Sequence, residues 1–312
     1  MKLRHSDMPI AYICRLPGKT EQTYYYHIRY QAQLINNESL IITKVVSLRE
    51  EMPGIGVSKL LHILTGHADF KEACPGRDKL YDLLRRHSLL LIRRVRRGPT
   101  TTNSRHRYML YPNFIRGLVV DRPDLLWVSD ITYLSTYAKF CYLSLITDAY
   151  SHPIVGYHVH HNLTTFGPAT ALRMALNTLD QDNIQELYHH SDRGSQYGSD
   201  AYIELLRSHT EIKISMTENG DPYENAIAER INGIGKHEFR LDQLFQTMSE
   251  MKAHVIKSIN SYNETRPHAS CDFLTPNQAH KGSGILAKRW KKNYKKKSLD
   301  ELEFQELAGE KV

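Results

Sequence analysis

The sequence of 312 residues is poor in cysteine, and no two of its cysteines form a C-x-x-C pair. Such wide spacing argues against a disulfide framework and against a structural zinc site, and it favours a reducing compartment. No zinc-finger spacing occurs between His161 and Cys271. The N-terminus lacks an apolar signal core, and no stretch is long and apolar enough to span a bilayer. We therefore expect a cytoplasmic protein. The four cysteines are Cys14, Cys74, Cys141 and Cys271.

Positive charge is scarce in the middle of the chain, although the whole carries a formal net charge of +7. Lys and Arg number 20 against 9 Asp and Glu in residues 1–120, 9 against 16 in residues 121–240, and 12 against 9 in residues 241–312. The net charges of the three parts are therefore +11, −7 and +3. An acidic centre between basic flanks suits a carboxylate metal site whose neighbours neutralise nucleic-acid phosphates. Ordinary variation between domains is the alternative.

Residues 1–91 are expected to form a helical DNA-binding region. Apolar residues recur at helical spacing in Ile55–Leu64 and in Gly76–His87, and Gly66 and Pro75 lie between the two segments. This pattern predicts a helix-turn-helix-like module; a plain helical hairpin is the alternative. Contact with DNA is favoured by the arginines that accompany and follow the second helix. They are Arg85, Arg86, Arg93, Arg94, Arg96 and Arg97.

Two further segments are strongly basic. Residues 92–124 are predicted to be a linker whose cations follow a duplex backbone, although a solvated charge run is the usual alternative. In the charged tail 288–312, the ten residues from Lys288 to Lys297 include seven cations with two interleaved aromatic residues. This tail, with Lys291 and Lys292 as candidate contacts, either binds phosphates or stays disordered.

Between the two basic segments the pattern is that of an α/β domain. Three runs rich in β-branched and aromatic residues predict successive strands, and helices then alternate with short strands. We expect a mixed sheet with helices packed on its faces over residues 125–240, followed by a C-terminal helical extension over 241–287. The predicted strands are Leu125–Leu134, Phe140–Asp148, Pro153–His160, one ending at His190, and Ile212–Ser215; the predicted helices are Phe166–Leu179, Asp200–Ser208 and Glu224–Arg240.

Three carboxylates occupy distinctive places in this layout. Asp130 lies in the middle of a strand, Asp192 just beyond a strand end, and Glu229 on a helix, with 61 and then 36 residues between them. Sites of open α/β sheets gather near the carboxyl ends of strands, so the three can converge. Hard oxygen ligands from separate segments are what a metal-dependent polynucleotidyl transferase needs. Asp148 is a competitor for the metal, although an Asp before a turn usually caps its own backbone.

Four motifs in one order make the chain resemble the DDE transposases of bacterial insertion sequences, of the OrfB type with a retroviral-integrase-like core. The resemblance covers about residues 45–280 and implies a ribonuclease-H-like core preceded by helix-turn-helix modules. The motifs are Trp127-x-x-Asp130-Ile-Thr-Tyr133, His190-Ser-Asp192-x-Gly194-x-Gln196-Tyr197, Pro222-Tyr-x-Asn225-Ala226-x-x-Glu229, and Tyr262-Asn-x-x-Arg266-Pro267-His268 followed by Leu274-Thr275-Pro276.

This resemblance implies that Asp130, Asp192 and Glu229 are the catalytic triad and the ligands of two Mg²⁺ ions, about 3.5–4 Å apart, which Mn²⁺ can replace. Asp130 is expected to bridge the two ions. His190 and Asn225 are expected to orient a carboxylate or to contact a phosphate. Arg266 is a further candidate for DNA contact, against the alternative that its segment simply packs on the core.

The resemblance also implies partners: double-stranded DNA, both transposon ends and target, and further copies of the chain assembled on it. An upstream-frame helix-turn-helix protein is a further partner that it allows, and a nucleoid-associated location follows. A catalytically idle DNA-binding regulator and a ribonuclease-H-type nuclease are the alternative functions. The chain departs from the family pattern at Glu224, Arg230 and Cys271, and it lacks the N-terminal His-His-Cys-Cys zinc module of retroviral integrases.

Overall fold

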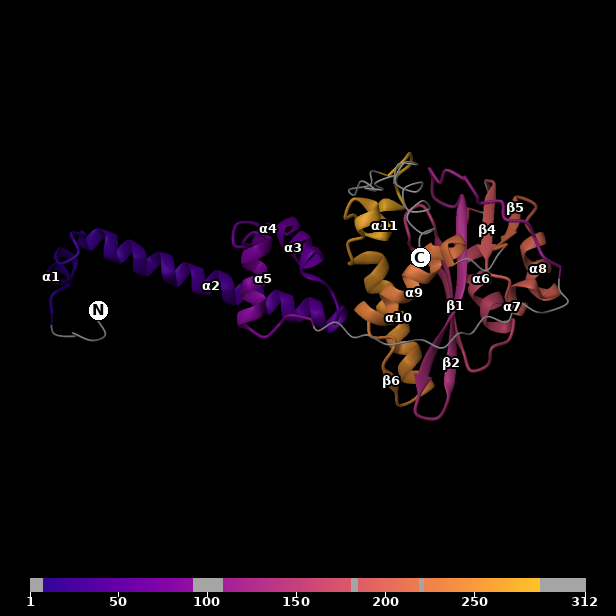
Figure 1. Cartoon of the computed structure of the whole chain (residues 1–312), viewed down its shortest axis with the longest axis horizontal. Helices are drawn as coiled ribbons and strands as arrows, with labels where there is room; N and C mark the ends of the chain where they lie inside the picture. Colours follow the sequence, from indigo (N-terminus) through magenta and orange to yellow (C-terminus); the bar gives the residue numbers. More distant parts are fainter. Residues whose placement is uncertain (1–7, 92–108, 181–184, 219–221, 287–312) are drawn as a thin grey trace, which may run out of the picture.

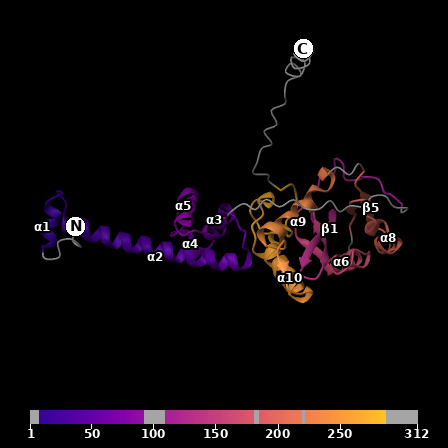
Figure 2. The ribbon, with the colours of Figure 1, turned by 60° about the horizontal axis from the view of Figure 1, so that its bottom comes forward.

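The computed structural model of the chain describes residues 8–91, 109–180, 185–218 and 222–286. An all-helical N-terminal region is joined to an α/β body, and the long α2 extends away from that body (Figures 1 and 2). Helices are present at both predicted segments: the first begins and ends two residues later than Ile55–Leu64, and the second is one residue shorter at each end than Gly76–His87. The N-terminal helices are α1 (Ile10–Arg15), α2 (Glu21–Glu51), α3 (Val57–Gly66), α4 (Ala68–Lys71) and α5 (Arg77–Arg86).

The C-terminal half of α2 anchors this region. The helix begins where the Thr20 hydroxyl accepts a hydrogen bond from the backbone N–H of Thr23. Only Ile41, Val45 and Leu48 are buried along its 31 residues, and they share one face because they recur at a spacing of four and three. They pack into the same cluster as the buried leucines of α3 and α5, which are Leu60, Leu64, Leu80, Leu83 and Leu84.

A mixed sheet forms the centre of the body. Its strand order is β3-β2-β1-β4-β5; the first three strands are antiparallel, and β4 and β5 run parallel to β1. This topology is ribonuclease-H-like, as predicted. A short sixth strand, which the sequence did not predict, pairs in parallel with β1. The strands are β1 (Leu126–Thr136), β2 (Phe140–Asp148), β3 (Ile154–His160), β4 (Leu187–Ser191), β5 (Ile212–Met216) and β6 (Leu244–Phe245).

Helices cover both faces of the sheet (Figure 1). Side chains of α6 and α8 pack with Trp127 of β1, whereas α9 and α10 pack with Leu134, which lies on the opposite face because strand residues alternate. Even-numbered residues of β1 therefore face α9. The helices are α6 (Phe166–Leu176), α7 (Ser195–Gly198), α8 (Asp200–Arg207), α9 (Ala226–Glu238), α10 (Met248–Glu264) and α11 (Pro276–Ala279), with 3₁₀ turns η2 (Pro222–Asn225) and η3 (Ala269–Cys271).

The second half of the predicted linker packs on the body. The backbone N–H of Met216 donates to the Pro112 carbonyl, and that of Phe114 donates to the Ser215 hydroxyl. Ile115 and Leu118 pack beside β1. Residues 92–108 and the tail from 287 onward lie outside the described residues. Among the helices that are described, none combines the length and apolarity needed to cross a membrane.

The N-terminal helices contact the body through the end of α9. The backbone N–H of Gly54 donates to the Glu238 carbonyl at 2.8 Å, and the Lys59 ammonium pairs with the Glu238 carboxylate at 2.7 Å. A Cβ at position 54 would come within 2.2 Å of the His237 carbonyl oxygen. Only glycine allows this approach.

Candidate active site

Asp130 lies on the face of β1 that α9 crosses. One carboxylate oxygen accepts a hydrogen bond from the Ile131 N–H at 2.8 Å and the other from the Asn232 amide at 2.7 Å. Burial, together with the charges of Asp192 and Glu229, raises the pKa of Asp130 to about 7, although the two hydrogen bonds oppose this shift. The three acidic groups predicted to work together are thus close enough to act on one another electrostatically.

Asp192 follows the last residue of β4, as the sequence predicted. The parallel register pairs Val128 with His190, so two further residues along each strand bring Asp192 level with Asp130. One oxygen of Asp192 accepts a hydrogen bond from the Gly194 N–H at 2.9 Å, which shapes the turn into α7. A Cβ on Gly194 would lie 2.9 Å from that same oxygen. The glycine keeps this side of the carboxylate open.

Glu229 is exposed in the first turn of α9, and burial raises its pKa. Within the part of the chain that the structure describes, the oxygens of the three carboxylates are not all within 4.8 Å of one another. In the described part of the chain, the group of three donors within 4.8 Å of one another is His152, His268 and Cys271, and not the carboxylates. Mutual repulsion between carboxylates favours this wider spacing.

The two residues predicted to support the carboxylates contact neighbouring strands. His190 is buried and its Nδ1 lies 2.9 Å from the Ser215 hydroxyl, in β5; burial lowers its pKa to about 4. The Asn225 amide donates to the Ser129 carbonyl at 3.0 Å. Asn225 thus ties the start of α9 to the backbone beside Asp130, whereas His190 contacts Ser215 of β5 and interacts with Glu224.

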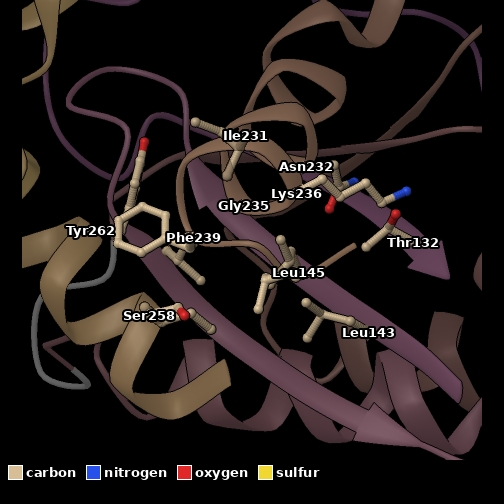
Figure 3. A pocket seen from close by; sticks show the side chains of 13 residues that line it. Thr132, Leu143, Leu145, Ile231, Asn232, Gly235, Lys236, Phe239, Ser258 and Tyr262 are labelled. Atoms are coloured by element: carbon tan, nitrogen blue, oxygen red, sulfur yellow. The ribbon is translucent and has the colours of Figure 1, made fainter. Parts of the chain in front are cut away.

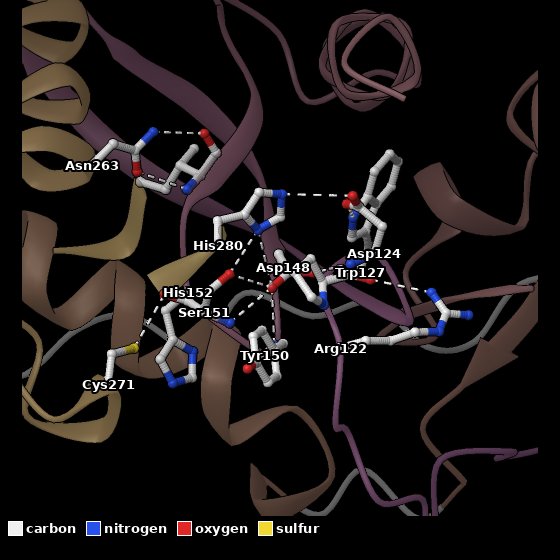
Figure 4. Close-up of polar contacts among 12 residues, drawn as sticks. Arg122, Asp124, Trp127, Asp148, Tyr150, Ser151, His152, Asn263, Cys271 and His280 are labelled. Atoms are coloured by element: carbon white, nitrogen blue, oxygen red, sulfur yellow. Dashed lines mark hydrogen bonds and ion pairs between the residues drawn. The ribbon is translucent and has the colours of Figure 1, made fainter. Parts of the chain in front are cut away.

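Asp148 acts as a cap. It is fully buried, and one oxygen accepts hydrogen bonds from the N–H groups of Tyr150 and Ser151 and from the Ser151 hydroxyl. The other oxygen accepts the Asp124 N–H at 2.8 Å. Both oxygens are therefore occupied by turn donors, as Figure 4 shows for the Ser151 contacts. The expectation that this residue caps its own backbone is confirmed.

Sequence reasoning missed two residues of α9 beside the site. The Asn232 amide donates a hydrogen bond to one oxygen of Asp130. Burial lowers the pKa of Lys236, and the negative charge of Asp130 opposes this lowering. Figure 3 shows both side chains on the side of α9 that faces β1, near Thr132. They follow Glu229 at steps of three and four, so helical spacing from the predicted catalytic glutamate could have found them.

A basic cleft of about 740 Å³ opens between the N-terminal helices and the body. The cationic residues that line it are Lys59 of α3, Arg77 of α5, Arg230 of α9 and Arg266, which follows α10. Among these, Arg77 is exposed and paired only with its neighbour Asp78. The opening of the cleft offers phosphate-binding groups that the sequence pattern did not single out.

Arg266 does not present a free guanidinium to this cleft. Its side chain is 3% exposed, and two of its nitrogens donate to the two Glu238 oxygens at 2.8 Å each. The alternative that its segment packs on the core matches this geometry, and the predicted DNA contact of Arg266 does not. The Arg266 guanidinium forms a bidentate pair with the Glu238 carboxylate, and the Lys59 ammonium pairs with the same carboxylate.

The remaining predicted DNA contacts differ in how they are placed. Arg85 pairs with Asp82 and Arg86 with Glu38, both on exposed positions, so each guanidinium keeps access to solvent. Exposed pairs of this kind are weak and yield readily to a phosphate. Of the other seven predicted contacts, Arg266 has been described above and six lie outside the described residues. Those six are Arg93, Arg94, Arg96, Arg97, Lys291 and Lys292.

Models of known protein families identify the class of the domain that contains the sheet. Two family models, each described as an integrase core domain, match residues 120–222 and 210–276. These ranges together contain the whole sheet and all three candidate carboxylates. The HTLV-2 integrase catalytic core domain in complex with magnesium is similar over 51% of this chain and 97% of its own, at 20% identity and a TM-score of 0.41.

The relatives narrow this class. The chain is 30% identical to the transposase for insertion sequence element IS904 of Lactococcus lactis over 59% of this chain and 76% of the relative. It is 34% identical to a transposase described for IS986/IS6110 of Mycobacterium tuberculosis, over 49% of this chain and 56% of the relative. The chain thus spans little more than half the length of the latter. It belongs to the family of insertion-sequence transposases with an integrase core.

Proposed function

We propose that this protein is a Mg²⁺-dependent DNA transposase that binds insertion-sequence ends, cleaves DNA strands and transfers them through Asp130, Asp192 and Glu229. The observation that carries the proposal is that Asp130 of β1 lies level with Asp192 at the end of the neighbouring β4, with Glu229 on α9 close enough for its charge to raise the pKa of Asp130. A buried carboxylate beside two others is costly unless a cation neutralises them. The family relationship of the chain supports the same reading.

The donor set fits a hard divalent cation, because all three groups offer carboxylate oxygens. Asp130, Asp192 and Glu229 would hold the ions. Bound Mg²⁺ would activate the attacking oxygen, of water or of a DNA 3′-hydroxyl, and stabilise the departing 3′-oxygen. The three carboxylates do not form a group within 4.8 Å among the described residues, so they would have to draw together to share the ions.

The chain's own residues orient the reacting groups. The Ile131 N–H and the Asn232 amide hold the Asp130 carboxylate in one rotamer, and Asn225 holds the neighbouring backbone. The Lys236 ammonium lies near Asp130 and offsets part of its negative charge. Such supporting contacts reduce the reorganisation that binding would otherwise require.

DNA is the proposed partner, as transposon ends and as target, and the chain is proposed to assemble on it in several copies within the bacterial nucleoid. An upstream-frame helix-turn-helix protein remains a prediction. The opening of the basic cleft, with Arg77 and Arg230, is a proposed path for the phosphate backbone, together with Arg85 and Arg86. Each phosphate contact adds to the salt dependence of binding.

A strand-transfer assay with oligonucleotide ends and Mg²⁺ tests the activity. We expect Asp130→Asn, Asp192→Asn and Glu229→Gln each to lower joining by at least about a thousandfold while sparing DNA binding. Asp69→Asn, on the exposed α4, is the matched control. Wild-type joining in any of the three variants would remove that residue from the triad.

The same assay separates the alternatives. A wild-type chain that binds but neither cleaves nor joins is the idle regulator, and one that cleaves without joining is the nuclease. For DNA binding, Arg77→Gln with Arg230→Gln should lower affinity about tenfold and reduce the salt slope by about 1–2. Arg173→Gln on α6 is the control. An unchanged slope would exclude the cleft, and the same measurement on the Arg93, Arg94, Arg96 and Arg97 variant tests that segment.

A further inference from the structure

Two histidines and a cysteine from distant parts of the chain meet beside the sheet. His152 lies in the turn between β2 and β3 with a positive φ of 66°, and His268 and Cys271 lie at η3, after α10. Their donor atoms all lie within 4.8 Å of one another. Figure 4 shows the His152 ring and the Cys271 side chain next to each other, with the Cys271 sulfur towards the Ser151 carbonyl.

Both imidazoles carry a buried nitrogen without a partner. Nδ1 of His152 and Nε2 of His268 are inaccessible to solvent, and neither takes part in a hydrogen bond. Orphaned buried polar atoms are rare because each gives up its hydrogen bonds to water. Two such nitrogens, on histidines that share a cluster with a thiol, therefore point to a missing ligand rather than to a packing accident.

The protonation states suit a soft cation. Burial, followed by the charges of Arg230 and Arg266, lowers the pKa of His152 to about 4, and burial with the charge of His152 lowers that of His268 to about 2. Both rings are thus neutral near pH 7 and keep a lone pair for a metal. Burial raises the pKa of the Cys271 thiol to about 12, but a coordinating thiol loses its proton to the metal.

We propose that His152, His268 and Cys271 bind a structural Zn²⁺ ion, with a water molecule as the fourth ligand. Two nitrogens and one sulfur are typical Zn²⁺ ligands, whereas the carboxylates of the proposed triad suit Mg²⁺. The ion would tie the β2–β3 turn to the segment that follows α10. The site is therefore separate from the DNA chemistry proposed above, in both its ligands and its purpose.

Binding requires two local changes. The Cys271 thiol donates to the Ser151 carbonyl at 3.2 Å, and that bond is given up when the thiol is deprotonated. Nδ1 of His268 accepts a long 3.3 Å bond from the Ser270 N–H, so ligation through Nε2 requires its proton to move to Nδ1. These two weak bonds are exchanged for metal–ligand bonds.

The charges around the site oppose one another: Asp148 raises the pKa of the Cys271 thiol, and Arg266 lowers it. Arg230, Arg266 and Lys59 place positive charge near His268, which opposes a dication. Arg266 and Lys59 are paired with Glu238, and a Cys271 thiolate cancels one charge of the ion. The cysteine is therefore essential to the proposal, since two neutral imidazoles alone would leave the full double charge.

Cobalt substitution in the purified full-length chain tests the proposal. After metal is removed with a chelator, added Co²⁺ should give a near-ultraviolet cobalt–thiolate absorption band that saturates at one ion per chain and disappears when Zn²⁺ is added. Cys271→Ser should lose the band, and Cys74→Ser, which changes a thiol of an unrelated segment, should keep it. Zn²⁺ should raise the Tm of the wild type and of Cys74→Ser only.

The variant His152→Asn guards against misfolding, because asparagine tolerates a positive φ. It should fold, judged by far-ultraviolet circular dichroism, and bind Co²⁺ at least about tenfold more weakly. Asp192→Asn should keep the full band, which separates this site from the catalytic carboxylates. A wild type without the band, or a Cys271→Ser variant that retains it, overturns the proposal whatever the outcome of the strand-transfer assay.

Discussion

At the scale of single residues, the surroundings of Asp130 disfavour the charged form of its carboxylate. Its carboxylate is removed from water, faces two other acidic groups, and keeps only two hydrogen-bond donors. Such a group destabilises the fold when no cation is bound. The amide of Asn232 has an oxygen without a partner, so it can turn and accept a bond from a neutral neighbour.

Replacing the charge should therefore stabilise the chain. We expect Asp130→Asn to raise the free energy of unfolding by about 1–2 kcal/mol in the presence of a chelator, because repulsion and desolvation of the carboxylate disappear. Urea denaturation of the wild type and the variant measures the difference. Asp69→Asn should change stability by less than about 0.5 kcal/mol. A less stable Asp130→Asn variant would contradict the expectation.

His280 is a second residue whose charge matters. Its Nδ1 lies 2.7 Å from the Ser151 hydroxyl, and its Nε2 lies 3.6 Å from an oxygen of Asp124 (Figure 4). Burial alone would lower the pKa of His280, but the bond to Asp124 and the charges of Asp148 and Asp124 raise it. The protonated ring thereby ties α11 to the end of the sheet.

This gives a definite pH dependence. A raised pKa in the folded state means that the contribution of His280 is fully present below its unfolded pKa, about 6.5, and is lost as the pH rises through the folded value. The stability difference between the wild type and His280→Gln should be largest near about pH 6 and should shrink by about pH 9. Chemical denaturation across this range measures it; a difference that grows with pH would refute the assignment.

At the scale of elements, α2 has two functionally different halves. Leu48 is buried among the leucines of α3 and α5, whereas Leu40, two turns earlier, is 45% exposed. Leu48→Ala should lower the free energy of unfolding by about 2–4 kcal/mol, because it leaves a cavity in a packed cluster. Leu40→Ala should change it by less than about 0.5 kcal/mol. Equal effects of the two substitutions on thermal denaturation would contradict the difference in burial between Leu48 and Leu40.

The packing of α6 on β3 depends on a single glycine. A Cβ at Gly156 would lie 2.2 Å from the Ala171 carbonyl oxygen and 2.9 Å from the Ala175 methyl group. The Ala171 carbonyl belongs to the backbone of α6 and cannot move out of such a contact without a large cost in free energy. Gly156 therefore sets how closely the helix approaches the sheet.

We expect Gly156→Ala to destabilise the protein by about 2–3 kcal/mol through overpacking. Gly66→Ala is the control, since its Cβ would meet nothing within 4 Å, and stability should be unchanged or slightly higher. Both are read from Tm and from urea denaturation. A neutral Gly156→Ala variant would show that α6 can shift outward without loss.

At the scale of the whole molecule, Glu238 joins the N-terminal helices to the body. It accepts hydrogen bonds from Lys59 of α3 and from Arg266 beyond α10, and its backbone carbonyl accepts the Gly54 N–H. Burial would raise the pKa of Glu238, but the bonds and charges of Arg266 and Lys59 lower it. One carboxylate thus connects three separate segments.

Glu238→Ala should lower the free energy of unfolding by about 2–4 kcal/mol, because it leaves the buried Arg266 guanidinium and the Lys59 ammonium unpaired. We also expect limited proteolysis to cut near residues 52–56 more readily. Glu204→Ala, at an exposed position of α8, is the matched control. Unchanged proteolysis alongside lower stability would mean that the pair stabilises the body without holding the helices to it.

The sequence alone determined the elements and their class. Periodicity depends on local residue order, so the strands, the major helices and a mixed sheet followed from apolar patterns. The positions of Asp130 in mid-strand and Asp192 after a strand end were predicted for the same reason. The ribonuclease-H-like arrangement was implied by the family resemblance that the motifs carry. The expectation that Asp148 caps a turn also rested on local order, and the structure confirms it.

Tertiary structure decided which distant side chains share a neighbour. The hydrogen bond from Asn232 to Asp130 exists because α9 packs on β1. The ion pair between Arg266 and Glu238 exists because the segment after α10 packs against the end of α9. His152 and Cys271 lie far apart in the chain, and cysteine spacing argued against a zinc site. Contacts of this kind depend on how elements pack, and a linear pattern records the faces of an element but not what lies against them.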